Sequence, residues 1–377
     1  MKNETDYKEL LNFYKGKRVL ITGNTGFKGS WLTYILLSAG AEITGYSLQS
    51  LSEFNLFSLA GLDSNPDLHQ ICGDIRDMVV LKDVFQSASP EIVLHLAAQP
   101  IVRDSYRDPM TTYTTNVNGT LNVLECMRTM PGVRSFLNVT TDKVYKNFEW
   151  EYGYRENDPL DGYDPYSNSK SCSELITHSY KDSFFMDKSV AISTVRAGNV
   201  IGGGDFSSDR IIPDCVRAID AGRKEGKSAI IGVRNPYSTR PYQHVLEALF
   251  MYLIIVMKQY EDASYADYYN VGPDDIDCVT TGDLVSTFCE KWNKGKTKHL
   301  PELYWENRSE ADAPHESNFL KLDCSKVKAR FGWHPHWHIE KAIEQIVGFT
   351  NIWMSGENVK TEMDKEIEEY IKSDEIS

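Results

Sequence analysis

The 377-residue chain lacks the features that mark membrane, secreted and nucleic-acid-binding proteins. It has no run of about 18 apolar residues to span a bilayer, and residues 1–17 lack the apolar core of a signal peptide. The 40 basic residues are outnumbered by 54 acidic ones, and the formal charge of -14 argues against nucleic acid or an anionic membrane as a general partner. We therefore expect a cytoplasmic protein that binds neither membrane nor nucleic acid.

Cysteine and histidine patterns of known metal sites are also missing. The seven cysteines form no CxxC or CxxH cluster, so neither a disulfide framework nor a structural zinc site is expected. The nine histidines show no HExxH spacing, and "HPHWH" at residues 334–338 is more typical of a surface loop. The sequence predicts no metal site.

Apolar runs alternate with helical stretches through the first 200 residues. "KRVLITG" predicts a buried strand, "GSWLTYILLSAG" a helix and "EITGYSL" a second strand, which together make a βαβ unit. Further apolar runs follow at 91–98, 135–141 and 190–200. This alternation predicts an α/β protein with a parallel, doubly wound sheet of the Rossmann type.

The pattern changes beyond about residue 200, where loops rich in glycine, proline and aspartate separate the helices. We predict a Rossmann domain over residues 1–198, which segments near 236–272 rejoin, and a smaller, interleaved C-terminal α/β lobe over 199–350. Residues 351–377 are polar on nearly every face and predict a solvated helix or tail.

The strongest local signal is "GNTGFKGS", in which Gly23, Gly26 and Gly29 follow a strand and open a helix. Glycines at this spacing permit a tight turn and let the backbone approach a pyrophosphate, which the helix N-terminus attracts. Asp74 lies where a carboxylate can accept a hydrogen bond from an adenine, although an aspartate there also suits a plain turn. The second strand ends in "YSLQ", which does not distinguish NAD from NADP. The motif predicts dinucleotide binding.

A second constellation combines Tyr166 and Lys170, four residues apart on a predicted helix, with Thr141 at a preceding strand end. The helical spacing puts the phenol and the ammonium on one face, so the cation can lower the phenol's pKa and also reach a bound ribose. Such pairs are common on ordinary helix surfaces. Together with the glycine motif, they predict a catalytic base, the group that tunes it and a hydrogen-bonding partner.

Seven motifs occur in the order found in the extended short-chain dehydrogenase/reductases: "GNTGFKGSWL", "HLAAQ", "NVNGT", "TTDKVY", "YDPYSNSK", "RAGNVIGGGD" and "RPYQHVLE". The chain resembles this family from about residue 14 to residue 350, and within it the 4,6-dehydratases of nucleotide sugars. The resemblance implies NAD as cofactor, a nucleotide-sugar-binding second lobe, a CDP-hexose substrate and a CDP-4-keto-6-deoxy sugar as product. Asn24 departs from the family, which usually has a histidine there.

The resemblance also implies the binding residues. For the cofactor they are Gly23, Asn24, Gly26, Phe27, Lys28, Gly29, Asp74, Ile75, Leu96, Ala97, Ala98, Tyr166 and Lys170. For the substrate they are Gln99, Arg103, Asn199, Arg234, Arg240 and His244. Arginine forks could grip a diphosphate through two hydrogen bonds each, although two arginines in a polar loop are often simply solvated.

The motif "TTDKVY" places Asp142 and Lys143 directly after Thr141 at the end of a buried strand. By resemblance, Asp142 would protonate the departing 6-hydroxyl, and Lys143 would stand where a glutamate usually removes the C5 proton. A lysine acts as a base only when its pKa falls toward neutrality. Alternatively, Lys143 stays charged and stabilises the enolate, or the two residues form an ion pair without a chemical role.

Three functions are compatible with these motifs. A 4,6-dehydratase uses the titratable pair after Thr141, whereas a nucleotide-sugar 4-epimerase needs the tyrosine and NAD but usually has small residues there. A non-enzymatic dinucleotide sensor would be expected to lose Thr141, Tyr166 or Lys170, and all three are present. The resemblance further implies a homodimer through a four-helix bundle, to which residues 111–130 and 167–185 would contribute.

Overall fold

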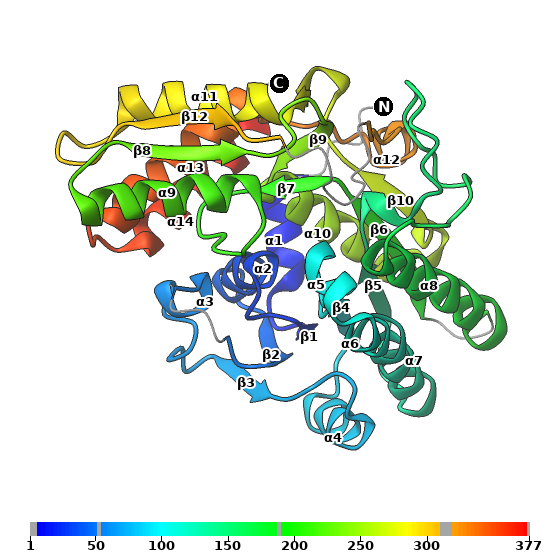
Figure 1. The fold of residues 1–377 in the computed structure, drawn as a ribbon. Helices are drawn as coiled ribbons and strands as arrows, with labels where there is room; N and C mark the ends of the chain where they lie inside the picture. Colours follow the sequence, from blue (N-terminus) through cyan, green and yellow to red (C-terminus); the bar gives the residue numbers. More distant parts are fainter. Residues whose placement is uncertain (1–5, 51–53, 187–189, 310–318, 375–377) are drawn as a thin grey trace.

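The computed structural model describes residues 6–50, 54–186, 190–309 and 319–374 (Figure 1). Its central layer is a seven-stranded sheet in the order β10-β6-β5-β4-β1-β2-β3, and neighbouring strands in it are parallel. The strands are β1 (Arg18–Thr22), β2 (Glu42–Ser47), β3 (Leu68–Cys72), β4 (Ile92–His95), β5 (Ser135–Val139), β6 (Ala191–Ala197) and β10 (Tyr268–Val271). The predicted doubly wound parallel sheet is confirmed.

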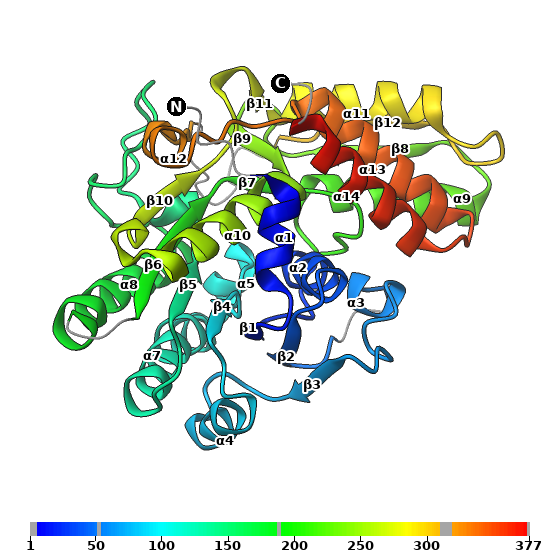
Figure 2. The same ribbon diagram turned by 180° about the vertical axis from the view of Figure 1, so that it is seen from behind.

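Helices cover both faces of this sheet because successive strand residues point to opposite sides. Val19 and Ile21 of β1 join the core shared with α1 (Tyr7–Tyr14), α2 (Phe27–Ser38) and α10 (Val245–Glu261). Leu20 instead joins the core under α4 (Met78–Ala88) and α7 (Gly119–Thr129). Seen from behind, α1 and α10 lie in front of the sheet (Figure 2).

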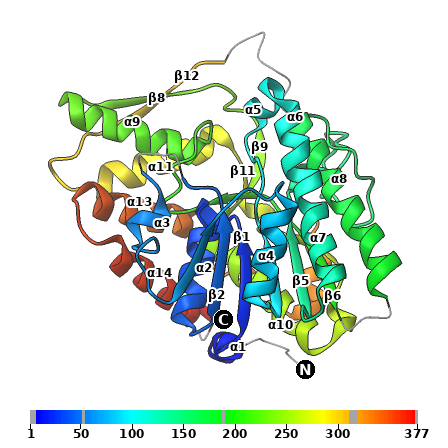
Figure 3. The same ribbon diagram turned by 90° about the horizontal axis from the view of Figure 1, so that it is seen from below.

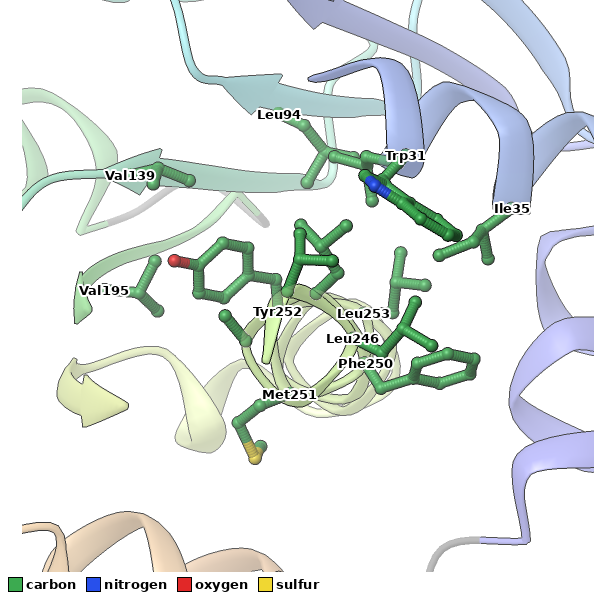
Figure 4. Packing of buried hydrophobic residues seen from close by; sticks show 14 of the residues in the cluster. Trp31, Ile35, Leu94, Val139, Val195, Leu246, Phe250, Met251, Tyr252 and Leu253 are labelled. Atoms are coloured by element: carbon green, nitrogen blue, oxygen red, sulfur yellow. The ribbon is translucent and has the colours of Figure 1, made fainter. Parts of the chain in front are cut away.

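The helix α10 carries apolar residues around almost its whole circumference, and it is buried on every side. Figure 4 looks along it and shows Trp31 and Leu94 on one side of the helix and Val195 on another. Since α10 and β10 follow the first segments of the second lobe in the chain, the two lobes alternate along the sequence. The domain boundaries themselves stay a prediction.

The second lobe has a core of its own between helices and short strands. Its helices are α9 (Ile211–Glu225), α11 (Thr281–Gly295) and α13 (Ile339–Met354), and β8 (Ala229–Val233) pairs in parallel with β12 (Leu303–Asn307). A three-stranded sheet, in the order β11-β9-β7, joins the lobes; it consists of β7 (Asn199–Ile201), β9 (Thr239–His244) and β11 (Cys278–Thr280).

The remaining helices border the site or the edges of the molecule. The helix α8 (Pro165–Tyr180) runs beside α7 on the outside, on the side opposite α9 (Figure 3). The shorter ones are α3 (Leu56–Leu59), α5 (Val102–Arg107), α6 (Pro109–Tyr113) and α12 (Ser325–Phe331). Across the described ranges, no helix combines the length and the apolar character needed to cross a membrane.

The C-terminal helix α14 (Val359–Asp374) corrects the expectation of a solvated tail. Val359, Met363, Glu366 and Tyr370 are buried, and their spacing puts them on one face of the helix. The Tyr370 hydroxyl donates to Glu247 Oε2 on α10 at 2.9 Å. This buried stripe is narrow and lies in an otherwise charged segment, so the amino-acid composition of the segment does not reveal it.

Candidate active site

The glycine motif forms a close turn between β1 and α2. Gly23 has φ 75°, and a Cβ there would lie 2.7 Å from the Ala97 nitrogen; a Cβ on Gly29 would lie 2.2 Å from the Gly23 carbonyl oxygen. Gly26 is the N-cap of α2 and offers no side chain to the first N–H groups of the helix. Those groups are therefore available to an anion, as in a site that binds a dinucleotide pyrophosphate.

The loop after β4 lies against this turn. The Leu96 and Ala97 nitrogens donate to the Thr22 carbonyl oxygen and hydroxyl at 3.0 and 3.3 Å, and Ala98 continues the same loop. Only glycine at position 23 allows this approach. The structure thus brings together the glycine motif and the predicted cofactor residues 96–98.

Two predicted cofactor residues turn out to be engaged within the protein. The Asn24 amide donates to Gln70 Oε1 at 2.6 Å and accepts from the Ser47 hydroxyl at 3.0 Å, so its side chain ties β1 to β2 and β3. Ile75 is buried against Gly119, where a Cβ would lie 2.6 Å from its Cγ2 atom. Both side chains are thus engaged within the protein, and the assignment of Asn24 and Ile75 to the cofactor stays a prediction.

Asp74 lies at the edge of the proposed adenine site. Beside it lies Arg76, a residue that sequence reasoning missed. The two side chains form a bidentate pair, with Arg76 Nη2 2.5 Å from Asp74 Oδ2. Hydrogen bonds from Arg76 lower the pKa of Asp74. The carboxylate therefore stays ionised and keeps acceptor capacity toward an adenine amino group.

The first two residues of α2, Phe27 and Lys28, lie near the catalytic helix α8. Phe27 is partly buried, and a Cβ on Gly202 would lie 3.0 Å from its ring. The Lys28 ammonium lies 5.8 Å from the centre of the Tyr252 ring. Burial, then the charges of Arg210 and Lys170, lower the pKa of Lys28 to about 7. Lys28 is thus close to the catalytic helix as well as to the glycine turn.

The turn after β5 carries the proposed acid. The Thr141 hydroxyl donates to Asp142 Oδ1 at 2.9 Å, and the Lys143 nitrogen donates to the same hydroxyl at 3.4 Å. The Asp142 side chain is buried, and its Oδ2 atom has no hydrogen-bond partner among the described residues. Burial raises the pKa of Asp142, against the opposing effects of Lys143, Thr141 and Arg240. This carboxyl is therefore biased toward its protonated form.

Tyr166 and Lys170 face the same turn from α8. Burial raises the pKa of Tyr166 to about 12, while Arg210 and a hydrogen bond with Thr141 act to lower it. The Lys170 ammonium donates to the Val139 carbonyl oxygen at 3.1 Å, and burial lowers its pKa to about 8. The structure therefore places the predicted Tyr166, Lys170 and Thr141 in one cluster.

Arg210 is a further member of the site that sequence reasoning missed. It is the N-cap residue of α9, lies 3.8 Å from Asp205 by its Nη1 atom, and contributes the largest cationic effect on Tyr166. The sequence offers only an arginine in the polar loop "SSDR", which is typical of a solvated residue. Its function depends on the loop folding back over α8.

The predicted substrate arginines converge from distant parts of the chain. Arg103 Nη1 lies 3.6 Å from Asp209 Oδ1, and Arg234 Nη2 donates to the same oxygen at 3.3 Å. Arg240 on β9 is buried, and its charge acts on Asp142. Asn199 begins β7, which pairs with β9. Arg103 and Arg234 thus meet at Asp209, while Arg240 lies near the catalytic turn.

Two predicted substrate residues have side chains engaged within the protein, and their assignment to the substrate stays a prediction. His244 is fully buried at the start of α10; its Nδ1 accepts from the Leu246 nitrogen at 3.3 Å and its Nε2 lies 3.5 Å from Glu366. The Gln99 side chain donates to Ile101 and Thr112 and so organises its own loop. Both side chains make polar contacts inside the protein, as buried polar groups in folded proteins generally do.

The glycine turn, the Tyr166–Lys170 helix and the parallel sheet define a nucleotide-binding protein of the short-chain dehydrogenase/reductase class. The family model described as GDP-mannose 4,6 dehydratase matches residues 20–346, and the chain belongs to that family. The curated CDP-glucose 4,6-dehydratase of Salmonella typhimurium is 42% identical over 368 residues, which cover 96% of this chain and 98% of the relative.

Solved structures show the same fold at lower identity. The dTDP-glucose 4,6-dehydratase of Streptomyces venezuelae, with NAD and TYD bound, has a TM-score of 0.73 at 21% identity and covers 90% of this chain and 98% of its own. The Thermus thermophilus UDP-glucose 4-epimerase, in complex with NAD, has a TM-score of 0.72 at 23% identity and covers 88% and 98%.

Proposed function

We propose that the protein is an NAD-dependent dehydratase that converts CDP-D-glucose to CDP-4-keto-6-deoxy-D-glucose. The observation that carries the proposal is the pair Asp142 and Lys143 on the same turn as Thr141 and facing Tyr166, where elimination of water needs titratable groups. The 42% identity to the CDP-glucose 4,6-dehydratase of Salmonella typhimurium supports the choice of CDP-glucose.

The glycine turn, Asp74 and residues 96–98 would hold NAD, with the pyrophosphate at the start of α2. When bound, the nicotinamide accepts a hydride from C4 and returns it to C6. Tyr166 removes the proton of the 4-hydroxyl, and the charge of Arg210 and the hydrogen bond with Thr141 favour its ionised form against the effect of burial. Thr141 orients the same oxygen through its hydroxyl.

Residues of the turn after β5 would carry out the elimination step. Asp142, whose pKa burial raises, holds a proton that it can give to the departing 6-hydroxyl. Lys143 either removes the proton from C5 or stabilises the enolate by its charge, and both roles place its ammonium next to C5. Arg103, Arg234, Arg240 and Asn199 would bind the diphosphate of the substrate.

A nucleotide-sugar 4-epimerase is the alternative within the same fold, since it uses the tyrosine and NAD without the titratable pair. Incubation of the purified protein with NAD and CDP-, dTDP-, UDP- and GDP-hexoses separates the two. We expect a 4-keto-6-deoxy product from CDP-glucose, whereas interconversion of glucose and galactose without a keto product would contradict the proposal.

We also propose a cytoplasmic homodimer in which α7 and α8 form a four-helix bundle with a second copy. The support is an outer surface near these helices with exposed apolar side chains: Met110 is 72%, Leu175 51% and Phe184 45% exposed. Such residues suit an interface. Light scattering should give twice the chain mass of 42.9 kDa, and a concentration-independent single-chain mass would contradict the dimer.

A further inference from the structure

Asp209 joins two arginines that come from different parts of the fold. Arg103 lies on α5, after the fourth strand of the large sheet, and Arg234 follows β8 in the second lobe. Both guanidinium groups point to one atom, Asp209 Oδ1, at 3.6 and 3.3 Å. The three side chains are 28–37% exposed, so the cluster is open to solvent and to a ligand.

The local backbone fixes this carboxylate in place. Asp209 has φ 56°, a left-handed conformation that aspartate, asparagine and glycine tolerate better than other residues. The segment before it is fixed by Arg217, whose Nη1 donates to the Phe206 and Ser207 carbonyl oxygens at 3.1 and 3.0 Å. The next residue, Arg210, acts on Tyr166. Asp209 therefore lies at the catalytic centre, on a turn whose preceding segment is held in place by hydrogen bonds from Arg217.

We propose that Asp209 is a specificity residue: its carboxylate competes with the diphosphate of a nucleotide sugar for the Arg103 and Arg234 guanidinium groups. This inference rests on the proposed function, which assigns the two arginines to the diphosphate. Carboxylate and phosphate oxygens accept the same hydrogen bonds from an arginine fork. A ligand must therefore displace Asp209 before it can use both arginines.

The competition weighs most on ligands that engage both arginines. A ligand that contacts one guanidinium group leaves Asp209 paired with the other, whereas a diphosphate that bridges the two must displace the carboxylate completely. Asp209 thereby weakens binding of all anions, and it does so most for nucleoside diphosphates. The result is a smaller difference in affinity between nucleoside diphosphates and smaller anions.

Calorimetric titration of the Asp209→Asn variant with CDP tests the proposal. Asparagine keeps the size and the left-handed conformation but removes the charge. We expect CDP to bind roughly three- to tenfold more tightly than to the wild type, the scale of two partly exposed ion pairs, and CMP to gain affinity too. The ratio of CDP to CMP affinity should rise, because CDP must displace Asp209 from both arginines and so gains more from the loss of its charge than CMP does.

Two controls distinguish the loss of the contact between Asp209 and the two arginines from a change in the net charge of the second lobe. Glu290→Gln removes one negative charge from an exposed pair with Lys294 on α11 and should change CDP affinity less than twofold. In an Arg103→Gln background, the change Asp209→Asn should lose most of its gain, because one of the two arginines it releases is already gone. A full gain in that background would overturn the proposal.

The sign of the effect separates this role from others. If Asp209 contacted the nucleotide directly, its substitution would weaken CDP binding; if it only stabilised the turn, it would shift the melting temperature and leave affinity unchanged. Either result, seen also in Asp209→Gly as a second variant that suits φ 56°, overturns the proposal. A wild type that binds dTDP or UDP but not CDP contradicts the proposed function alone, and the same comparison is then made with that nucleotide.

Discussion

Two buried polar clusters border the segment 140–145. Opposite charges are paired in the first cluster, whereas burial dominates the pKa values in the second. In the first, which we term the matched cluster, Arg196 donates to Glu174 through Nε at 2.9 Å and to the Tyr145 hydroxyl at 2.7 Å, while the Thr140 hydroxyl donates to Glu174 Oε1 at 2.5 Å. Burial acts to raise the pKa of Glu174, but the charge of Arg196 and the hydrogen bonds with His178, Arg196 and Thr140 together outweigh it and bring the pKa to about 2.

The second cluster, which we term the reactive cluster, consists of Asp142, Tyr166, Lys170 and Lys28. Here burial dominates: it raises the pKa of Asp142 and of Tyr166 and lowers the pKa of both lysines. One Asp142 oxygen has no partner among the described residues. Matched charges hold the turn in place, whereas groups poised to change protonation state suit proton transfer.

The largest effect should come from breaking the matched cluster. Glu174→Gln leaves Arg196 buried without its counter-charge, and we expect the free energy of unfolding to fall by about 3–5 kcal/mol in urea titrations. The double variant Glu174→Leu with Arg196→Met should lose less than the single one. A single variant within about 1 kcal/mol of wild type would contradict this view of the cluster.

The pH dependence of the same pair follows from its depressed pKa. The carboxyl has a pKa of about 2 in the folded chain against an ordinary value of 4.5, so the unfolded chain binds more protons between these values. The contribution of Glu174 is therefore fully present above about pH 4.5 and is lost as the pH falls toward 2. The stability difference between wild type and Glu174→Gln should shrink over this window.

In the reactive cluster, substitution should affect turnover far more than stability. Tyr166→Phe removes only the phenolic oxygen, and we expect turnover to fall by roughly a hundredfold or more, the scale of a positioned acid or base. Tyr252→Phe is a matched control, because it removes a buried hydroxyl that has no hydrogen-bond partner among the described residues. Near wild-type turnover in Tyr166→Phe would remove this residue from the mechanism.

Lys143→Met should separate elimination from oxidation. If Asp142 and Lys143 serve only C5 and C6, oxidation at C4 persists, and a single turnover should show reduced nicotinamide absorbance together with a 4-keto hexose. Formation of the 6-deoxy product should drop about a hundredfold. Normal product formation would make Lys143 a structural residue, and no reduced cofactor at all would assign it to the oxidation step.

The smallest effect concerns Lys28, whose pKa is about 7 in the folded chain against an ordinary value of 10.5. Between these values the unfolded chain binds one proton more, so stability rises with pH, by at most about 1.4 kcal/mol per pH unit and by less where solvent reaches the ammonium. Relative to Lys28→Met, the wild type should gain stability from pH 7 to 9 in urea titrations. A flat difference would contradict the lowered pKa.

The sequence predicted those features that local spacing determines. The alternating apolar runs specified the parallel sheet, and the glycine spacing before α2 and the four-residue spacing of Tyr166 and Lys170 identified the turn and the catalytic helix. Asp142 and Lys143 were found because they follow Thr141 at a strand end. In each case neighbours in sequence are neighbours in space.

Features that depend on distant contacts were missed. The convergence of Arg103 and Arg234 on Asp209 joins residues more than 100 positions apart, and no local pattern indicates it. His244 belongs to a motif with substrate residues, yet the backbone turns its ring toward Glu366. Glu366 lies on α14, and the buried face of that helix could not be recognised among the charged residues of its sequence.

Transfer of label within the sugar tests the central claim most directly. CDP-glucose that carries deuterium at C4 is incubated with the enzyme and a catalytic amount of NAD, and the product is examined by mass spectrometry and NMR. Because the hydride removed from C4 is returned to C6, we expect the deuterium at C6 of a 4-keto-6-deoxy product, with no net reduction of the cofactor. Stoichiometric NADH without a 6-deoxy sugar, or deuterium that remains at C4, would contradict the account.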